Sequence, residues 1–273
     1  MSKIVAISNQ KGGTAKTSTT LALGASFADR GQRVLLVDLD PQASLTAATG
    51  TPLSGRPTVY TAMMHYLAHD EAPDLTDTLH PIAPGLILLP SSIDLAAAEM
   101  ELVTAVRREY ILSEVLAPTL DSYDVVLIDC PPSLGLLVVN ALTAAHEVLI
   151  PVVPEYLAAH GLHLLLGSIG RIRKAKLNPR LAVTGIILTM VDNRTTHGRT
   201  VGEEIRASIG RQVPVLGEVK RSIKVAEAAA AGVPITTYAA RSDTALAYGE
   251  IATELLRTWG LAPVGVGEAV THG

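Results

Sequence analysis

Residues 8–20 read SNQKGGTAKTSTT, and this stretch determines the fold expected for the 273-residue chain. The apolar run Lys3–Ser8 just before it predicts a strand, and the amphipathic stretch that opens at Thr17 predicts a helix. Gly12 and Gly13 therefore lie between a strand and a helix. In that position backbone N–H groups turn inward to form an anion nest, and the helix N-terminus adds a partial positive charge. The stretch predicts a phosphate-binding loop.

The loop departs twice from the usual GxxxxGK[ST] pattern of nucleotide-binding loops. Gln10 and Ala15 stand where that pattern has glycine, whereas Lys16 and Thr17 fit it. In such loops the lysine reaches the β- and γ-phosphates, and the hydroxyl that follows ligates Mg²⁺. A tight strand-to-helix turn with chance lysines is the alternative interpretation.

Carboxylates end two further predicted strands. In VLLVDLDPQASL (34–45), Asp38 and Asp40 are two residues apart and face the same side. In YDVVLIDCPPSLG (123–135), four apolar residues precede Asp129 at the strand end. Carboxylates near a phosphate site hold Mg²⁺ or orient an attacking water. An ordinary strand-ending turn explains Pro41 but not both acids of the first stretch.

Short β-branched runs alternate with longer helical patterns, which is typical of βαβ units. Several runs, such as VLIPVV, are continuously apolar, as expected of strands covered on both faces. We expect an α/β fold with a mainly parallel twisted sheet of about seven to eight strands, flanked by helices on both faces. The predicted strands are Lys3–Ser8, Arg33–Asp38, Gly85–Pro90, Tyr123–Asp129, Glu147–Val153, Ala182–Met190 and Val213–Glu218; the predicted helices span about 16–30, 93–108, 136–145, 159–176, 199–210, 222–231 and 242–258, and 49–84 is irregular.

Composition limits the class of protein. Hydrophobic residues make up 48% and charged residues 18%, which is typical of a globular chain. The single cysteine, Cys130, allows no disulfide framework, so we expect a reducing cytosol and a buried thiol. Polar residues interrupt both the N-terminal apolar run and the region 134–154, which fits neither a secretory signal nor a membrane span. We expect one domain over 1–258 and a flexible tail over 259–273.

Positive charge gathers in one segment of an acidic chain. The net charge is −4, yet residues 171–224 carry twelve basic and four acidic residues. This asymmetry indicates a surface that faces a polyanion, or else a set of solvated helix faces.

Six stretches, in order over residues 3–258, resemble the ParA-type partition ATPases of the ParA/MinD superfamily. These are P-loop NTPases with a deviant Walker A motif, KGGxGK[TS]. The matching stretches are KGGTAKTS (11–18), VLLVDLDPQAS (34–44), DVVLIDCPPSLGLLVVNAL (124–142), PEYLAAHGL (154–162), TMVDNRT (189–195) and EAAAAGVPITTYAARS (227–242). The resemblance accounts for Gln10, because this family has its loop glycines at Gly12 and Gly13, and it leaves Ala15 as a departure.

The resemblance implies ATP or ADP with Mg²⁺ as ligands. Asp40 would position the attacking water, Asp129 would be the Walker B acid, and Asp38 would support the metal's water shell beside Thr17. Lys11 would be the signature lysine that crosses an ATP-dependent dimer interface, and it counts with Lys16 and Asp40 as catalytic. The implied nucleotide-binding residues are Lys11, Gly12, Gly13, Thr14, Ala15, Lys16, Thr17, Ser18, Pro154 and Asn193.

The resemblance also implies a role in chromosome or plasmid partition. The ATP-bound homodimer would bind DNA without sequence preference through Arg194, Arg221 and Lys224, and a ParB-type protein would stimulate hydrolysis. Such a protein is cytoplasmic and nucleoid-associated. No membrane anchor of MinD type is expected, because the tail after Trp259 has no lysine or arginine.

Ala15 leaves a second function open. If the backbone at this position needs a positive φ, a non-glycine residue costs roughly 1 kcal/mol or more. We therefore expect slow turnover. The alternative is a degenerate, non-hydrolysing nucleotide-binding switch that positions another cargo.

Overall fold

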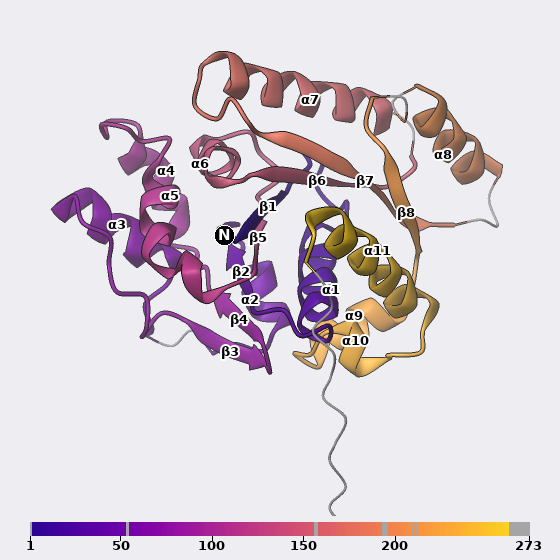
Figure 1. The fold of residues 1–273 in the computed structure, drawn as a ribbon, viewed down its shortest axis with the longest axis horizontal. Coiled ribbons are helices and arrows are strands. Elements are labelled where there is room, and N and C mark those ends of the chain that lie inside the picture. Colours follow the sequence, from indigo (N-terminus) through magenta and orange to yellow (C-terminus); the bar gives the residue numbers. More distant parts are fainter. Residues whose placement is uncertain are drawn as a thin grey trace, which may run out of the picture.

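The computed structural model describes residues 2–52, 55–155, 158–192, 196–208, 210 and 212–261. Within these residues, eight strands form one sheet in the order β3-β4-β2-β5-β1-β6-β7-β8. All neighbouring strands in this sheet are parallel except β3 and β4. Figure 1 shows helices on both faces, which confirms the expected α/β fold. The strands are β1 (Lys3–Ile7), β2 (Val34–Asp38), β3 (His80–Ala83), β4 (Leu86–Leu89), β5 (Val125–Asp129), β6 (Glu147–Val152), β7 (Ala182–Val191) and β8 (Val215–Lys220).

All seven expected helices have a counterpart in the structure, but the short helices Ser44–Ala48, Ile111–Leu116, Ala117–Ser122 and Ile235–Tyr238 were not expected, and two regions differ further. In its described residues, the segment 49–84 expected to be irregular contains the helix Val59–His69 and the unpredicted edge strand β3. The helix expected over 93–108 ends at Leu102, where Arg108 Nη1 donates to the carbonyl of Val103 and Arg107 adopts a left-handed φ of 54°. The helices are α1 (Lys16–Ala28), α2 (Ser44–Ala48), α3 (Val59–His69), α4 (Leu95–Leu102), α5 (Ile111–Leu116), the 3₁₀ helix η1 (Ala117–Ser122), α6 (Leu136–Ala144), α7 (Ala158–Lys174), α8 (Thr196–Ser208), α9 (Ile223–Ala230), α10 (Ile235–Tyr238) and α11 (Asp243–Trp259).

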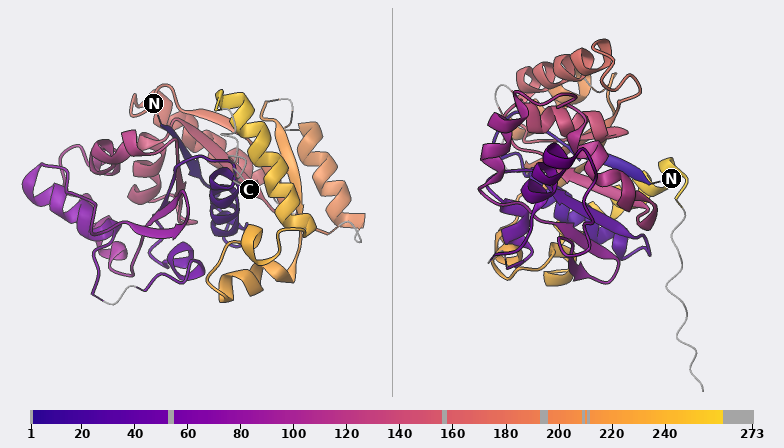
Figure 2. Two further views of the ribbon diagram at one scale, coloured as in Figure 1. Left: turned by 60° about the horizontal axis from the view of Figure 1, so that its bottom comes forward. Right: turned by 90° about the vertical axis from the view of Figure 1, so that its left-hand side faces the viewer.

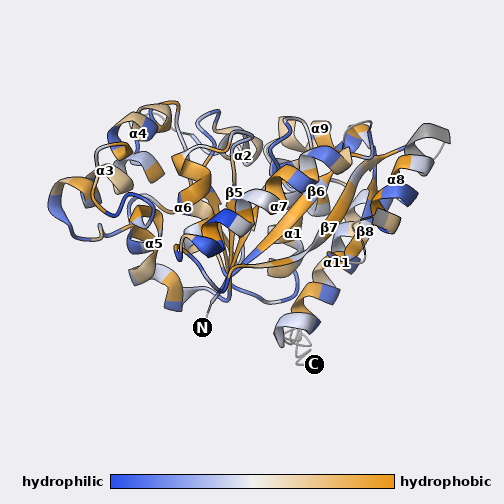
Figure 3. Cartoon of the chain, turned by 90° about the horizontal axis from the view of Figure 1, so that it is seen from above, coloured by the Kyte–Doolittle hydropathy of each residue, from blue (hydrophilic) through white to orange (hydrophobic). Residues whose placement is uncertain are grey.

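Both faces of the sheet are buried, which explains the continuously apolar strands. Along β1, Ile4 and Ala6 join the core beneath α3 to α8, while Val5 and Ile7 join the core beneath α1, α9 and α11. Figure 3 accordingly shows apolar strands between helices whose polar residues lie largely on the outside. The thiol of Cys130 is fully buried, as expected. In the part of the chain described, no helix is long and apolar enough to cross a membrane.

The first and last helices pack side by side, as Figure 2 shows in indigo and yellow. The hydroxyls of Thr19 and Tyr248 are 2.9 Å apart, and the rings of Phe27 and Trp259 lie 5.5 Å apart. Trp259, the first residue of the expected tail, is thus the last residue of α11. The tail beyond Leu261 lies outside the described residues.

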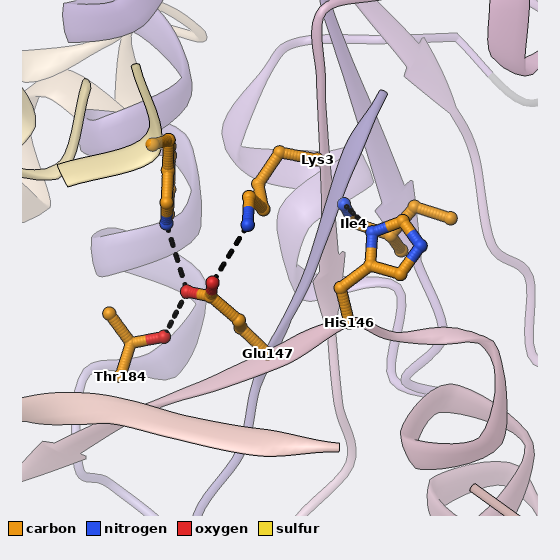
Figure 4. Close-up of polar contacts among 6 residues, drawn as sticks. Lys3, Ile4, His146, Glu147 and Thr184 are labelled. Atoms are coloured by element: carbon orange, nitrogen blue, oxygen red, sulfur yellow. Dashed lines mark hydrogen bonds and ion pairs between the residues drawn. The ribbon is translucent and has the colours of Figure 1, made fainter. Parts of the chain in front are cut away.

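A partly buried acid ties the amino-terminal edge of the sheet together (Figure 4). Glu147, at the start of β6, accepts hydrogen bonds from Lys3 Nζ (2.8 Å), Trp259 Nε1 (2.9 Å) and the hydroxyl of Thr184. Burial alone would raise the pKa of Glu147, but these hydrogen bonds outweigh it and lower the pKa below its ordinary value. The network joins β1, β6, β7 and α11.

Two glycines bring α2 and α9 into backbone contact. Gly50 follows α2 and Gly232 follows α9, and both adopt left-handed conformations, with φ of 67° and 69°. A Cβ on Gly232 would lie 3.0 Å from Cα of Gly50. Both positions therefore require glycine for the conformation and for the close approach.

Candidate nucleotide-binding site

The predicted phosphate loop lies at the carboxyl end of the central strand β1, between β1 and α1. Asn9 anchors its start, because Nδ2 donates to the carbonyl of Pro151 (2.7 Å) and Oδ1 accepts from the amide of Lys11 (3.0 Å). The hydroxyl of Thr189 in β7 donates to the carbonyl of Thr14 (3.0 Å). Neighbouring strand ends thus hold the loop at two points.

The glycines of the loop face open space. Gly12 and Gly13 are exposed, and a Cβ built on either would meet no atom within 4 Å. Gly13 has a left-handed φ of 71°. This backbone leaves room for a group as large as a phosphate to approach the loop, as an anion nest requires.

Ala15 is held in a left-handed conformation. It is the N-cap of α1, with φ 62° and ψ 31°, and its side chain makes no capping hydrogen bond. The positive φ considered as a possibility from the sequence is therefore present, and an alanine bears the steric penalty that a glycine would avoid. The departure from the glycine pattern therefore places a strained residue at the start of α1.

The two loop lysines occupy different environments. Lys16 is buried, its Nζ lies 3.4 Å from the carbonyl of Lys11, and its pKa is lowered mainly by burial, with Asp129 opposing. A desolvated ammonium folded over an open anion nest fits a phosphate group. Lys11 is half-exposed and pairs with Glu155, with Nζ and Oε2 2.6 Å apart.

Asp129 lies directly beside the start of α1. Its Oδ2 accepts from the hydroxyl of Thr17 (2.7 Å), and its Oδ1 accepts from the hydroxyl of Thr20 (3.3 Å). Burial, followed by the charge of Asp38, raises the pKa of Asp129 to about 8. A hydroxyl paired with a carboxylate beside a phosphate loop is an oxygen donor set of the kind that Mg²⁺ takes.

Asp38 and Asp129 are register partners at the ends of the adjacent strands β2 and β5. Strand β5 thus separates β2 from β1. Both oxygens of Asp38 are occupied: Oδ2 accepts from the amide and hydroxyl of Thr46 (2.8 and 2.7 Å), and Oδ1 from the amide of Asp40 (3.2 Å). Burial, only partly offset by these bonds, raises the pKa of Asp38 to about 6. The half-buried Asp40 follows on the loop.

A cavity of about 370 Å³ adjoins the loop on the side of β7 and β8. Ala15 and Ser18 form its loop wall, and Met190, Arg221 and Val225 are among the residues that face them. Tyr248 closes it from α11. The buried Pro154 follows β6 and is not among the residues that line this cavity.

Comparison with known proteins identifies the family. Residues 2–183 match a family described as AAA domain. The chain is 40% identical to the sporulation initiation inhibitor protein Soj of Bacillus subtilis, over 93% of this chain and 98% of Soj. It is 38% identical to the chromosome partitioning protein ParA of Caulobacter vibrioides, over 93% of this chain and 94% of ParA. The chain belongs to the ParA/Soj family of partition ATPases.

A solved structure also matches the ParA/Soj fold of this chain from end to end. It is the cobyrinic acid a,c-diamide synthase from Mycobacterium smegmatis with bound ADP and magnesium, at a TM-score of 0.81 and 38% identity. The match covers 95% of this chain and 96% of that one. A protein of this fold thus accommodates ADP and magnesium.

The remaining candidates of this ParA/Soj member lie near the same edge or outside the described residues. Arg221 and Lys224 are exposed at the start of α9, and Arg221 also lines the cavity. Asn193 and Arg194 lie outside the described residues. Among the residues that the structure describes, no three His, Cys, Asp or Glu side chains form a metal site by themselves.

Several polar residues around the site were not singled out from the sequence. Asn9 and Thr189 anchor the loop, Thr20 is the second hydroxyl on Asp129, Thr46 binds the carboxylate of Asp38, and Ser91 binds the backbone carbonyl of Asp40. Thr20, three residues after Thr17 on α1, carried a usable signal, because residues three apart share a helix face. Ser91 carried none.

Proposed function

We propose that the chain is a Mg²⁺-dependent ATPase of DNA segregation, serving chromosome or plasmid partition. The observation that carries this proposal is the convergence of Lys16, Thr17 and Asp129 on an open glycine loop at the start of α1. ATP and ADP are the proposed nucleotides. The matching structure with ADP and magnesium and the near full-length match to Soj support both assignments.

The phosphates would lie against the amides of the loop. Gly12, Gly13 and the start of α1 would supply N–H donors, and Lys16 would turn from the carbonyl of Lys11 to the phosphate oxygens. The base and ribose would occupy the cavity beside Ala15 and Ser18 rather than the neighbourhood of Pro154. Thr14 and Ser18 complete the nucleotide-binding set, with Asn193 as an untested member.

Thr17 and Asp129 fit Mg²⁺, because a hydroxyl and a carboxylate oxygen already lie 2.7 Å apart. The ion would neutralise charge on the phosphates. Asp38 is better suited to hold the adjacent loop than the water shell of the metal, since its oxygens already accept three hydrogen bonds. Asp40, on that loop, would orient the attacking water and accept its proton.

Dimerisation and DNA binding would follow from nucleotide binding. Lys11 lies exposed at the loop and would reach the nucleotide of a second copy once released from Glu155. Arg221 and Lys224, with Arg194 as an untested member, would contact DNA phosphates without reading bases. A ParB-type partner would stimulate hydrolysis and release the protein from the nucleoid in the cytoplasm.

The experiment that tests the proposal is size-exclusion chromatography with ADP, with a slowly hydrolysed ATP analogue and without nucleotide. We expect a shift from monomer to dimer only with the analogue and Mg²⁺, and no shift for Lys16→Ala. Calorimetry on the same samples should show nucleotide uptake by the wild type. Absence of uptake of any adenine nucleotide would refute the proposal.

A non-hydrolysing switch remains the second candidate, and the left-handed Ala15 is the observation that favours it. Such a protein would dimerise with ATP itself and remain a dimer. A steady-state phosphate-release assay with DNA and a basic partner peptide separates the two, because the ATPase releases phosphate and the switch does not.

A further inference from the structure

A closed ring of buried and partly buried hydrogen bonds includes the backbone amide and carbonyl of Asp40. The ring runs from Asp38 through Thr46 and Ser91 to Asp40 and back to Asp38. Asp38, Thr46 and Ser91 are completely buried. These residues come from the end of β2, from α2 and from the segment after β4.

Ser91 is the member that joins a separate strand to this loop. Its amide donates to the hydroxyl of Thr46 (3.0 Å), and its own hydroxyl donates to the carbonyl of Asp40 (2.8 Å). β4 pairs in parallel with β2, with Leu89 opposite Val37, so Ser91 lies level with the residues that follow β2. The sheet register therefore brings Ser91 to Asp40.

The backbone of Asp40 is held by hydrogen bonds at both its amide and its carbonyl. Its amide donates to Asp38 Oδ1 (3.2 Å), and its carbonyl accepts from Ser91 Oγ and from the amide of Ala43 (both 2.8 Å). The side chain accepts at Oδ1 from the amide of Gln42 (2.9 Å). With the peptide fixed, the carboxylate of Asp40 has little freedom beyond its own side-chain torsions.

We propose that Ser91 is a positioning residue for Asp40, with Thr46 and Asp38 holding Ser91 and the Asp40 peptide in one arrangement. The inference rests on the proposed function, in which Asp40 orients the attacking water. Ser91 does not line the cavity beside the phosphate loop, and its hydrogen bonds are to Thr46 and Asp40. Its removal should therefore disturb the hydrolytic step and leave nucleotide binding intact.

The test compares Ser91→Ala with a matched control, Thr49→Val. Thr49 is also buried, and its hydroxyl donates to the carbonyl of Thr46 (2.8 Å) on α2 and lies 2.8 Å from the hydroxyl of Thr51, so its hydrogen bonds do not involve Asp40. We expect Ser91→Ala to lower kcat for ATP roughly tenfold with KM within about twofold, since small misplacements of a catalytic group are costly. Thr49→Val should leave kcat close to the wild-type value.

A second measurement needs no ATP. In hydrogen exchange followed by mass spectrometry, Ser91→Ala should speed exchange of amides in 40–46 and leave 11–18 unchanged, whereas Thr49→Val should leave Asp40 and Gln42 protected. Unchanged exchange in 40–46, or an equal loss of kcat in both variants, would overturn the positioning role. A wild-type protein without hydrolysis would refute the proposed ATPase instead, and the exchange data would still decide the role of Ser91.

Discussion

Lys11 Nζ and Glu155 Oε2 form an ion pair of 2.6 Å within one chain, between the phosphate loop and the segment after β6. Both side chains are about half exposed, so the pair contributes only about 0.5 to 1 kcal/mol. In the proposed dimer, this energy would have to be overcome before Lys11 reached a second copy. The pair would therefore favour the monomer by a small, measurable amount.

Glu155→Gln should promote dimerisation. Because the substitution releases Lys11, half-maximal dimer should form at a two- to fivefold lower concentration of a slowly hydrolysed ATP analogue, as roughly 0.5 to 1 kcal/mol implies. Sedimentation velocity measures this. Glu114→Gln, which weakens the solvent-exposed pair with Arg107 outside the loop, is the control and should not change the concentration at half-maximal dimer. An unchanged or higher requirement for Glu155→Gln would contradict the prediction.

Ala15→Gly should strengthen nucleotide binding or speed hydrolysis. The substitution removes a Cβ from a residue with φ 62° and relieves about 1 kcal/mol, which corresponds to roughly fivefold in affinity or rate. Isothermal calorimetry with ATP analogue and a phosphate-release assay measure both. Lys176→Gly relieves a similar backbone, with φ 60° after α7, and should leave both quantities unchanged. Equal or weaker activity of Ala15→Gly would show that strain at this position does not limit the site.

Arg221→Ala and Lys224→Ala should each weaken DNA binding at all sequences alike. Each lost phosphate contact should reduce the slope of log K against log salt by about 0.9. Fluorescence anisotropy with ATP analogue measures the slope. The control is Arg33→Ala. It removes a cation that pairs with Asp124, and these two residues precede β2 and β5 at the amino-terminal ends of the strands. Because Arg221 lines the cavity, the nucleotide affinity of the Arg221→Ala variant is measured separately. A wild-type affinity that does not fall with salt would exclude phosphate contacts.

Glu147 should make the fold sensitive to acid. Its pKa is lowered in the folded state, so its charged form contributes stability above the ordinary value of 4.5, and this contribution is lost as pH falls below it. Glu147→Gln should cost about 1 to 3 kcal/mol at pH 7, since it weakens charge-assisted hydrogen bonds from Lys3 and Trp259. Urea unfolding at pH 7 and at pH 4 tests this, and the difference between the two proteins should shrink at the lower pH. A constant difference would contradict the linkage.

The central part of the fold was predictable because its signals are local. Continuously apolar runs such as VLLVD mark strands buried on both faces, and the observed strand ends lie close to those expected. The phosphate loop was predictable for the same reason, since glycines between a strand and a helix need no tertiary context. Asp38, Asp40 and Asp129 could be singled out as candidates because each ends or closely follows an apolar strand.

The rest depended on contacts between distant residues. Strand β3 and helix α3 lie in a segment rich in Pro, Thr and His, where local preference is weak. The pattern over 93–108 is helical throughout, yet Arg108 and Asn140 hold the chain in a turn after α4, because Asn140 Nδ2 donates to the carbonyl of Arg108 (2.8 Å). Ser91 reaches Asp40 only through the register of β4 on β2. No pattern within the sequence around Ser91 contains that information.

The contact between Gly50 and Gly232 constrains any variant of this chain. One glycine closes the helix that follows the acids of β2, and the other closes the helix that begins with Arg221 and Lys224. With only hydrogen atoms between the two backbones, neither segment has a compressible layer of side chains to absorb displacement by the other. A rigid shift of one segment would therefore displace the other. A substitution that changes the spacing between Gly50 and Gly232 would need a compensating change in the facing segment.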